Sequence, residues 1–173
     1  MLLKVSGVVF VMAATTFIGI RKADDIQEEY RQMRYLQRIM SMMESEIRYA
    51  RSHLGEIFSH IASHAQEPYK GWLLSMQRDM NSGNGGTFDE IWCQAIEGYL
   101  KDSGLPRGEL TRLIQLGNQL GVVDLKLQLN ILTLYQQQLS LSMEEMKEGM
   151  KTRVRLCHCL GMMSGMLISI LLI

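Results

Sequence analysis

Two groups of residues in this 173-residue chain contain cysteine or histidine at spacings that raise the question of a metal ion. The first group, Cys157, His158 and Cys159, lies between a basic segment and an uncharged apolar end. Successive side chains of a helix are about 100° apart, so these three cannot converge on one tetrahedral ion without outside help. We interpret the triplet as the start of an apolar membrane segment and expect no metal there.

The second group is the best metal candidate in the chain. His60 and His64 are four residues apart, and Glu56 precedes them by one helical turn, so a helix would place all three on one face. This spacing is weak as a metal motif, because a zinc protease helix carries a catalytic Glu directly after the first His, where this chain has Ile61. A solvated polar face is the favoured interpretation, and we predict no metal site.

Residues 82–86, a glycine-rich run, resemble a phosphate-binding loop in composition only. The Lys-Ser/Thr pair of a P-loop does not follow, and no strand pattern precedes the run. Thr87 and Glu90 instead predict a capping box at the start of a helix. No paired carboxylates and no nucleophile with a neighbouring base were found, so we predict no catalytic residues, no cofactor and no enzymatic activity.

Charge is distributed unevenly between the ends and the middle of the chain. Acidic and basic residues are equal in number, 18 of each, but six of the basic residues flank the apolar ends. The middle therefore holds 12 basic and 18 acidic residues, a net charge of −6. Nucleic-acid binding surfaces have the opposite sign, so we expect no nucleic-acid partner.

The apolar ends predict two transmembrane segments, at residues 1–22 and 155–173, with a soluble domain at 23–154. Residues 156–173 carry no charge, and in a helix they would extend about 27 Å, close to the hydrocarbon thickness of a bilayer. Cations that border membrane spans favour the cytoplasm. Five of the six flanking cations lie between the apolar segments and the middle, so we expect the acidic domain to face the cytoplasm.

A cleaved signal peptide is an alternative interpretation of the first apolar segment. Lys4 would provide its basic start and the following run its apolar core. Arg21 and Lys22 directly after the run oppose export, and the best small-residue cleavage site, near Ala13 and Ala14, falls inside the run. The sequence leaves open whether this segment is retained or cleaved.

Helical periodicity runs through the whole middle of the chain, and no convincing strand alternation occurs. Apolar residues recur at steps of three and four from Met33 to Leu54, and further helices are expected before Pro68, after it, from Thr87 to Gly104, from Pro106 to Gly121 and from Asp124 onward. We predict an all-α antiparallel bundle of about six helices, with a transmembrane helix at each chain end.

Gly117 and Gly121 are four residues apart on the apolar face of the helix expected at 106–121. A glycine inside a helix costs about 1 kcal/mol relative to alanine, so its presence on a packed face predicts the close approach of another element. Gly121 is equally consistent with a simple helix stop. We name Gly117 and Gly121 as a helix-packing motif.

Exposed acidic residues are the candidates for contact with a partner, because the excess negative charge of the domain must meet either solvent or a basic surface. The candidates are Glu44, Glu46, Glu56 and Asp124. A solvated face that keeps the domain soluble is an equally good interpretation.

Three sequence stretches and the apolar ends together resemble the stage III sporulation protein AB family of endospore-forming bacteria. They are EIRYARSHLGEIF at 46–58, FDEIW at 88–92 and LIQLGNQLGVVDLKLQLNIL at 113–132. The LGNQLGVVD part, with Gly117, Gly121 and Asp124, is also similar to the helical F domain of type II secretion and type IV pilus platform proteins. Those proteins usually carry two such domains and more membrane spans.

The resemblance implies a non-enzymatic scaffold or platform subunit of a secretion-like channel complex between mother cell and forespore. It implies other membrane proteins of that complex as partners, a secretion-type ATPase (stage III sporulation protein AA) docked on the helical domain, and a place in the outer forespore membrane with that domain on the mother-cell side. A membrane-tethered coiled-coil sensor or signalling adaptor is the alternative function. It predicts a parallel homodimer, whereas the bundle allows a monomer or a homo-oligomer.

Overall fold

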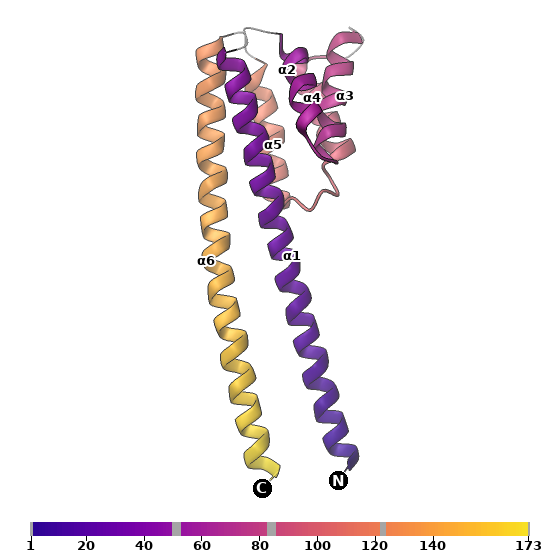
Figure 1. The fold of residues 1–173 in the computed structure, drawn as a ribbon, viewed down its shortest axis with the longest axis vertical. Helices are drawn as coiled ribbons and strands as arrows, with labels where there is room; N and C mark the ends of the chain where they lie inside the picture. The colour runs from indigo at the N-terminus through magenta and orange to yellow at the C-terminus, as the bar shows by residue number, and fades with distance from the viewer. Residues whose placement is uncertain (1, 50–52, 83–85, 122–123, 173) are drawn as a thin grey trace. The chain divides into compact units, whose positions relative to one another are not determined.

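The chain folds into six helices, with no strand in the residues that the structure describes. The structure is a computed structural model that describes residues 2–49, 53–82, 86–121 and 124–172, and side chains within 24–149 of these ranges. The helices are α1 (Leu2–Tyr49), α2 (Leu54–His64), α3 (Tyr69–Ser82), α4 (Phe88–Tyr99), α5 (Arg107–Leu120) and α6 (Leu125–Leu172) (Figure 1). The predicted all-α class and the predicted number of helices are confirmed.

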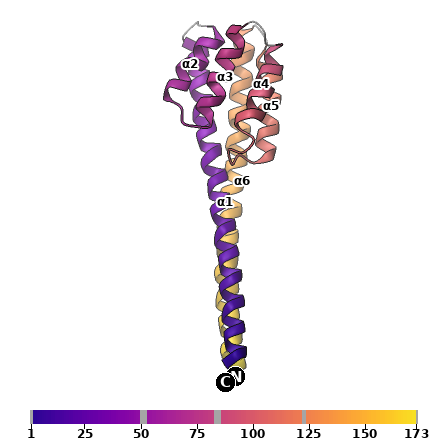
Figure 2. The same ribbon diagram turned by 90° about the vertical axis from the view of Figure 1, so that its right-hand side faces the viewer.

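The chain divides into two compact units. One unit comprises residues 29–143 and is called the bundle here; the other comprises the chain up to Glu28 and from Glu144 onward. Successive helices of the bundle run in opposite directions and are joined by short connections (Figures 1 and 2). Consequently the starts of α2, α4 and α6 lie at the same end of the bundle, which we call the turn end.

The predicted membrane spans, 1–22 and 155–173, lie outside the residues whose side chains are described. Within the residues whose side chains are described, no helix is long and apolar enough to cross a membrane. The helix α1 continues through Asp24 and Asp25, so these residues do not open a new helix. Likewise α6, expected from Asp124 onward, is continuous from Leu125 to Leu172.

The apolar stripe predicted on α1 forms one side of the core. Its members from Met33 to Ile47 are buried together with Ile39. The predicted stripe does not continue on α1 to Leu54, because α1 ends at Tyr49 and Leu54, which is half-buried, begins α2. Residue 50 lies outside the described residues. The fully buried side chains of this stripe, with at most 1% exposure, are Met33, Leu36, Ile39, Met40 and Met43. Methionine side chains are unbranched and flexible, so they can fit the irregular space of a core between helices.

Four aromatic rings join α2, α3 and α4. The Trp72 and Trp92 rings are fully buried and lie edge to face, with centroids 5.0 Å apart. Phe58 of α2 and Phe88 of α4 lie 6.2 Å and 5.7 Å from the Trp92 ring. Aromatic pairs at such distances contribute about 0.5–1.5 kcal/mol each beyond their area burial. The predicted capping box positions this cluster, because the amide of Thr87 donates to the Glu90 carboxylate at the start of α4.

The Trp92 ring lies directly on α5. Its Nε1 donates a hydrogen bond to the carbonyl oxygen of Leu113 at 2.7 Å, and a Cβ added to Gly117 would be 2.1 Å from ring atom Cδ1. No side chain can replace glycine there without displacing the ring. A Cβ at Gly121 would meet Phe88 at 3.6 Å, an ordinary contact, and Gly121 is the C-terminal cap of α5.

Two buried polar side chains, Glu109 of α5 and Tyr135 of α6, are only partly satisfied by hydrogen bonds. Arg112 donates to one carboxylate oxygen of Glu109, which is 6% exposed, while the other oxygen and the Tyr135 hydroxyl have no hydrogen-bond partner in the described structure. Burial, followed by the negative charge of Glu109, raises the pKa of Tyr135 far above its ordinary value. The phenol therefore stays protonated, and its hydroxyl carries an uncompensated desolvation cost.

We predict that Gly117→Ala destabilises the protein by about 1–3 kcal/mol, because the added methyl forces the Trp92 indole out of its place. Chemical denaturation of the full chain, followed by Trp fluorescence and helical circular dichroism, measures the change. Gly108→Ala on the same helix is the matched control. Its methyl would meet nothing within 4 Å, so it should be neutral or stabilising. Equal stability of the two variants would contradict the packing role of Gly117.

We predict that Tyr135→Phe leaves stability unchanged or raises it by about 1 kcal/mol, because it removes a buried hydroxyl that has no partner. Tyr69→Phe is the control, since the Tyr69 hydroxyl donates to the carbonyl oxygen of Gln32 at 3.3 Å and its loss should be destabilising. The same denaturation experiment compares them. If Tyr135→Phe proves the more damaging of the two, the hydroxyl has a partner after all.

Candidate functional site

Glu44 lies in a polar network between α1 and α6. One of its carboxylate oxygens accepts a hydrogen bond from Gln136 Nε2 at 2.7 Å, and the other pairs with Arg48 one turn later. Ser41 completes the network by donating to Gln136 Oε1 at 2.9 Å. The Glu44 side chain is 21% exposed. Both carboxylate oxygens of Glu44 are therefore engaged, one of them in the contact between α1 and α6.

Glu46 faces α2 from the other side of α1. Its carboxylate is 3.0 Å from His60 Nδ1, and its side chain is 27% exposed. The His60 ring meets the His64 ring edge to face at 5.6 Å. Within the residues whose side chains are described, no three His, Cys, Asp or Glu side chains gather as a metal ion would require. Cys157, His158 and Cys159 lie outside those residues.

Glu56 and Asp124 are exposed, and both lie at the turn end of the bundle. Glu56 is in the first turn of α2. One Asp124 oxygen accepts a hydrogen bond from the amide of Lys126 at 2.8 Å and so caps the start of α6. Asp89, in the first turn of α4, is also exposed at this end. We call Glu56, Asp89 and Asp124 the acidic end.

These three carboxylates lie at the starts of three helices, where the positive end of the helix dipole attracts negative charge. Among the described residues, no basic side chain forms an ion pair with Glu56 or Asp89 within 4.0 Å. The negative charge of the acidic end is therefore available to a partner. The four acidic candidates do not form a single surface, because Glu44 and Glu46 are engaged between helices while Glu56 and Asp124 face solvent.

An exposed basic face on α1 was missed by the sequence analysis. Arg34 and Arg38 are exposed, lie opposite the buried apolar stripe of α1 (called the methionine stripe below) and form no ion pair with any described residue. Summing the charge over the whole middle concealed them, although their four-residue spacing on the polar side of a predicted amphipathic helix was visible. The acidic domain thus has a local positive surface.

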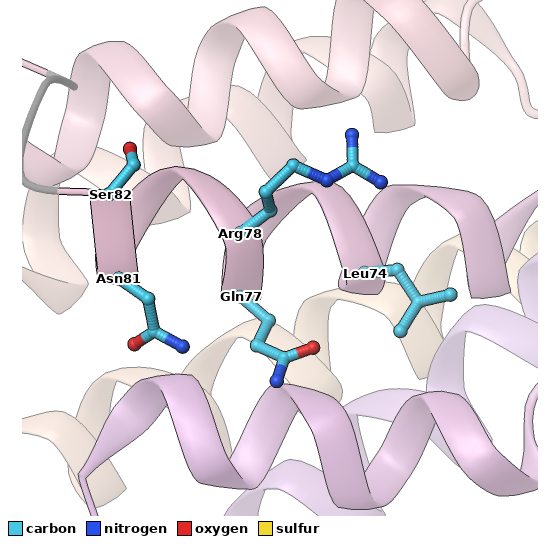
Figure 3. A pocket seen from close by; sticks show the side chains of 5 residues that line it. All are labelled: Leu74, Gln77, Arg78, Asn81 and Ser82. Carbon is cyan, nitrogen blue, oxygen red and sulfur yellow. The ribbon is translucent and has the colours of Figure 1, made fainter.

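A shallow, open surface depression lies on α3. Leu74, Gln77, Arg78, Asn81 and Ser82 line it, and all five belong to this one helix (Figure 3). Asn81 also lies against α2, because a Cβ added to Gly55 would be 3.2 Å from its Oδ1. The depression contains no nucleophile with a neighbouring base. All of its lining residues belong to the surface of one helix, so the depression is not an enclosed ligand-binding site.

Cys93 on α4 is half-buried, and its sulfur is 4.0 Å from the Glu97 carboxylate. Burial, followed by the negative charges of Glu97 and Asp89, raises the pKa of the Cys93 thiol. A raised pKa disfavours the reactive thiolate. The surroundings of Cys93 therefore do not activate it as a nucleophile.

Comparison with known proteins gives consistent matches along the chain. A family model described as "Stage III sporulation protein AB" matches residues 4–173. Stage III sporulation protein AB of Bacillus subtilis (strain 168) is 26% identical over 171 residues, which are 99% of each chain. A solved structure of a stage III sporulation protein AB matches with a TM-score of 0.64 and 22% identity, over 72% of this chain and 97% of the other. At that identity, the structural match shows the fold alone.

Proposed function

The chain belongs to the stage III sporulation protein AB family, and from this membership we propose that it is a membrane-anchored, non-enzymatic platform subunit of a secretion-like complex between mother cell and forespore. The family match over residues 4–173 is the observation that carries the proposal. In this proposal the bundle docks a secretion-type ATPase, and the two apolar ends hold the bundle at the outer forespore membrane, on the mother-cell side.

The sequence of the two ends supports anchoring. Residues 5–20 and 156–173 are uncharged, and each run is bordered by cations on the side of the bundle. The helices α1 and α6 extend from the bundle into these runs without a break. A connection to two anchors through helices suits a subunit that transmits force between an ATPase and a channel.

The acidic end is the docking surface that we propose for the ATPase. Its carboxylates are exposed, whereas Glu44 and Glu46 are engaged inside the bundle. Unpaired surface charge accelerates the encounter with a basic partner and selects against partners of like charge. The proposed contact therefore depends on Glu56 and Asp124 among the acidic residues named from the sequence.

The alternative function is a membrane-tethered coiled-coil sensor or adaptor. The methionine stripe of α1, which could have formed an intermolecular coiled coil, is buried inside the bundle. This burial favours the platform function over a signalling helix that pairs through α1.

We predict that Ser82→Cys, in a full chain whose own three cysteines are changed to serine, reacts with a membrane-impermeant thiol reagent only after cells are permeabilised. Ser82 is exposed at the end of α3, and the proposed topology places it in the cytoplasm. Gel shift of the labelled chain measures the reaction. Labelling in intact cells would show that the topology is the reverse of the proposed one. Recovery of the chain in the soluble fraction would contradict the proposed membrane anchoring.

We predict that the double variant Glu56→Gln and Asp124→Asn binds the ATPase of the complex about tenfold more weakly and with less dependence on salt. Asparagine preserves the helix cap at position 124, so the fold should be unaffected. The control, Glu97→Gln with Asp102→Asn, removes the same charge from the opposite end of the bundle. Equal affinities for the two variants in a pull-down titration would exclude the acidic end as the docking surface.

A further inference from the structure

The side of α6 that faces away from the core carries a second stripe. Leu127, Leu134 and Leu141 are seven residues apart and are 44%, 54% and 59% exposed. Asn130 and Gln137, also exposed, alternate with them, so the five residues follow one another at steps of three and four. This is the spacing of positions a and d in a coiled coil. We call these five residues the leucine stripe.

Charge is absent from this part of the helix. From Leu127 to Met143 the sequence contains no charged residue, although the domain around it has a net charge of −6. A surface helix normally carries charged residues on its solvent side. Exposed leucines within an uncharged stretch of surface helix are typical of the centre of a protein–protein interface.

The described residues of the bundle do not cover the leucine stripe. The other face of α6 makes the internal contacts: Leu132, Tyr135 and Leu139 are buried, Gln136 bonds to α1, and Ser142 accepts a hydrogen bond from Arg112 of α5. These contacts hold α6 in one rotational position, which leaves the leucine stripe outward. A partner of the stripe must therefore come from outside the bundle.

We propose that the leucine stripe pairs in parallel with the same stripe of a second copy of this chain. Two acidic domains repel each other, and the uncharged stretch from 127 to 143 lets them approach with like charges opposite each other only at its two ends, at Asp124 and Glu144. The stripe is also self-complementary, because a parallel pair would stack each leucine on its counterpart. Asn130 and Gln137 would each meet their own counterpart, and such amide pairs fix the register of a coiled coil.

The parallel direction rests on the proposed function. Since α6 continues as a helix to Leu172, two copies anchored in the same face of one membrane have parallel α6 helices. Residues 127–143 extend only about 25 Å, which makes an interface smaller than those of stable dimers. Pairing is therefore weak in dilute solution and is strengthened by the high effective concentration of chains that share a membrane.

Disulfide cross-linking of the full chain in membranes tests the proposal. In a chain without its native cysteines, single variants Leu127→Cys, Leu134→Cys and Leu141→Cys should each form a homodimer on mild oxidation, because paired stripes bring equivalent Cβ atoms within disulfide range. Gln94→Cys, exposed on α4, is the control for random collisions. We expect about tenfold more dimer at the three stripe positions than at position 94, the ratio that a preference of about 1.4 kcal/mol produces.

Orientation is tested by mixing the Leu127→Cys and Leu141→Cys chains with tags of different size. Parallel pairing gives the two homodimers, whereas antiparallel pairing, in which Lys126 would approach Glu144 of the other copy, gives the mixed dimer. The mixed dimer would overturn the parallel arrangement. Yields no higher than at position 94, or cross-links to other proteins in place of the second copy, would overturn the pairing.

A charge placed in the stripe provides an independent measurement. Leu134→Glu should reduce the Leu141→Cys homodimer about tenfold, through lost leucine burial and like-charge repulsion, while Gln94→Glu should leave it unchanged. Circular dichroism checks that both variants keep their helices, as the exposure of both positions leads us to expect. A full yield from Leu134→Glu would overturn the proposal. Fractionation of the cells reports separately on membrane anchoring, so failure of anchoring and failure of pairing remain distinguishable.

Discussion

The contact between the Trp92 indole and the backbone of α5 at Gly117 is the constraint on which the bundle depends. The indole donates to Leu113 on one side and meets the rings of Trp72, Phe58 and Phe88 on the others, so one side chain determines the positions of α2, α3 and α5 relative to α4. The position of α5 then determines that of α6, through the Gln128 amide bonded to the carbonyl of Leu120 and the Arg112 bond to Ser142. Because these bonds fix the rotation of α6, they also determine that the leucine stripe faces outward.

Polar side chains decide the rotation of the two long helices, which apolar contacts alone leave loosely determined. Gln136 is bonded to both Ser41 and Glu44, and this pair of bonds fits one alignment of α6 against α1. A hydrophobic stripe can slide by one turn at small cost, whereas a half-buried amide with both ends engaged cannot, since a shift would leave polar atoms without partners. Glu44 and Glu46 thus stabilise the fold, and of the four acidic candidates only Glu56 and Asp124, at the starts of α2 and α6, remain exposed.

Much of the fold could be predicted from the sequence, because the patterns that indicate its helices involve residues close together in the chain. The methionine stripe of α1, the capping box at Thr87 and the packing position of Gly117 each follow from spacing or from the cost of glycine inside a helix. The burial of Glu109 and the use of Glu46 by His60 could not be predicted, because each depends on a residue from another helix. The leucine stripe was present in the sequence, but it shares α6 with the buried stripe of Leu132 and Leu139, and periodicity alone does not tell which of two stripes faces the core.

The two proposed surfaces occupy different parts of the bundle, and they meet at the first turn of α6. The oxygen of Asp124 that caps this helix is 3.4 Å from the amide of Leu127, the first member of the leucine stripe. A partner that draws the Asp124 carboxylate away would loosen that turn, while pairing of the stripe in a second copy would hold it helical. Docking and pairing would then bias the same short segment, and by linkage each would change the affinity of the other by the same factor. The sign of the coupling depends on whether the docked partner leaves the cap of α6 intact.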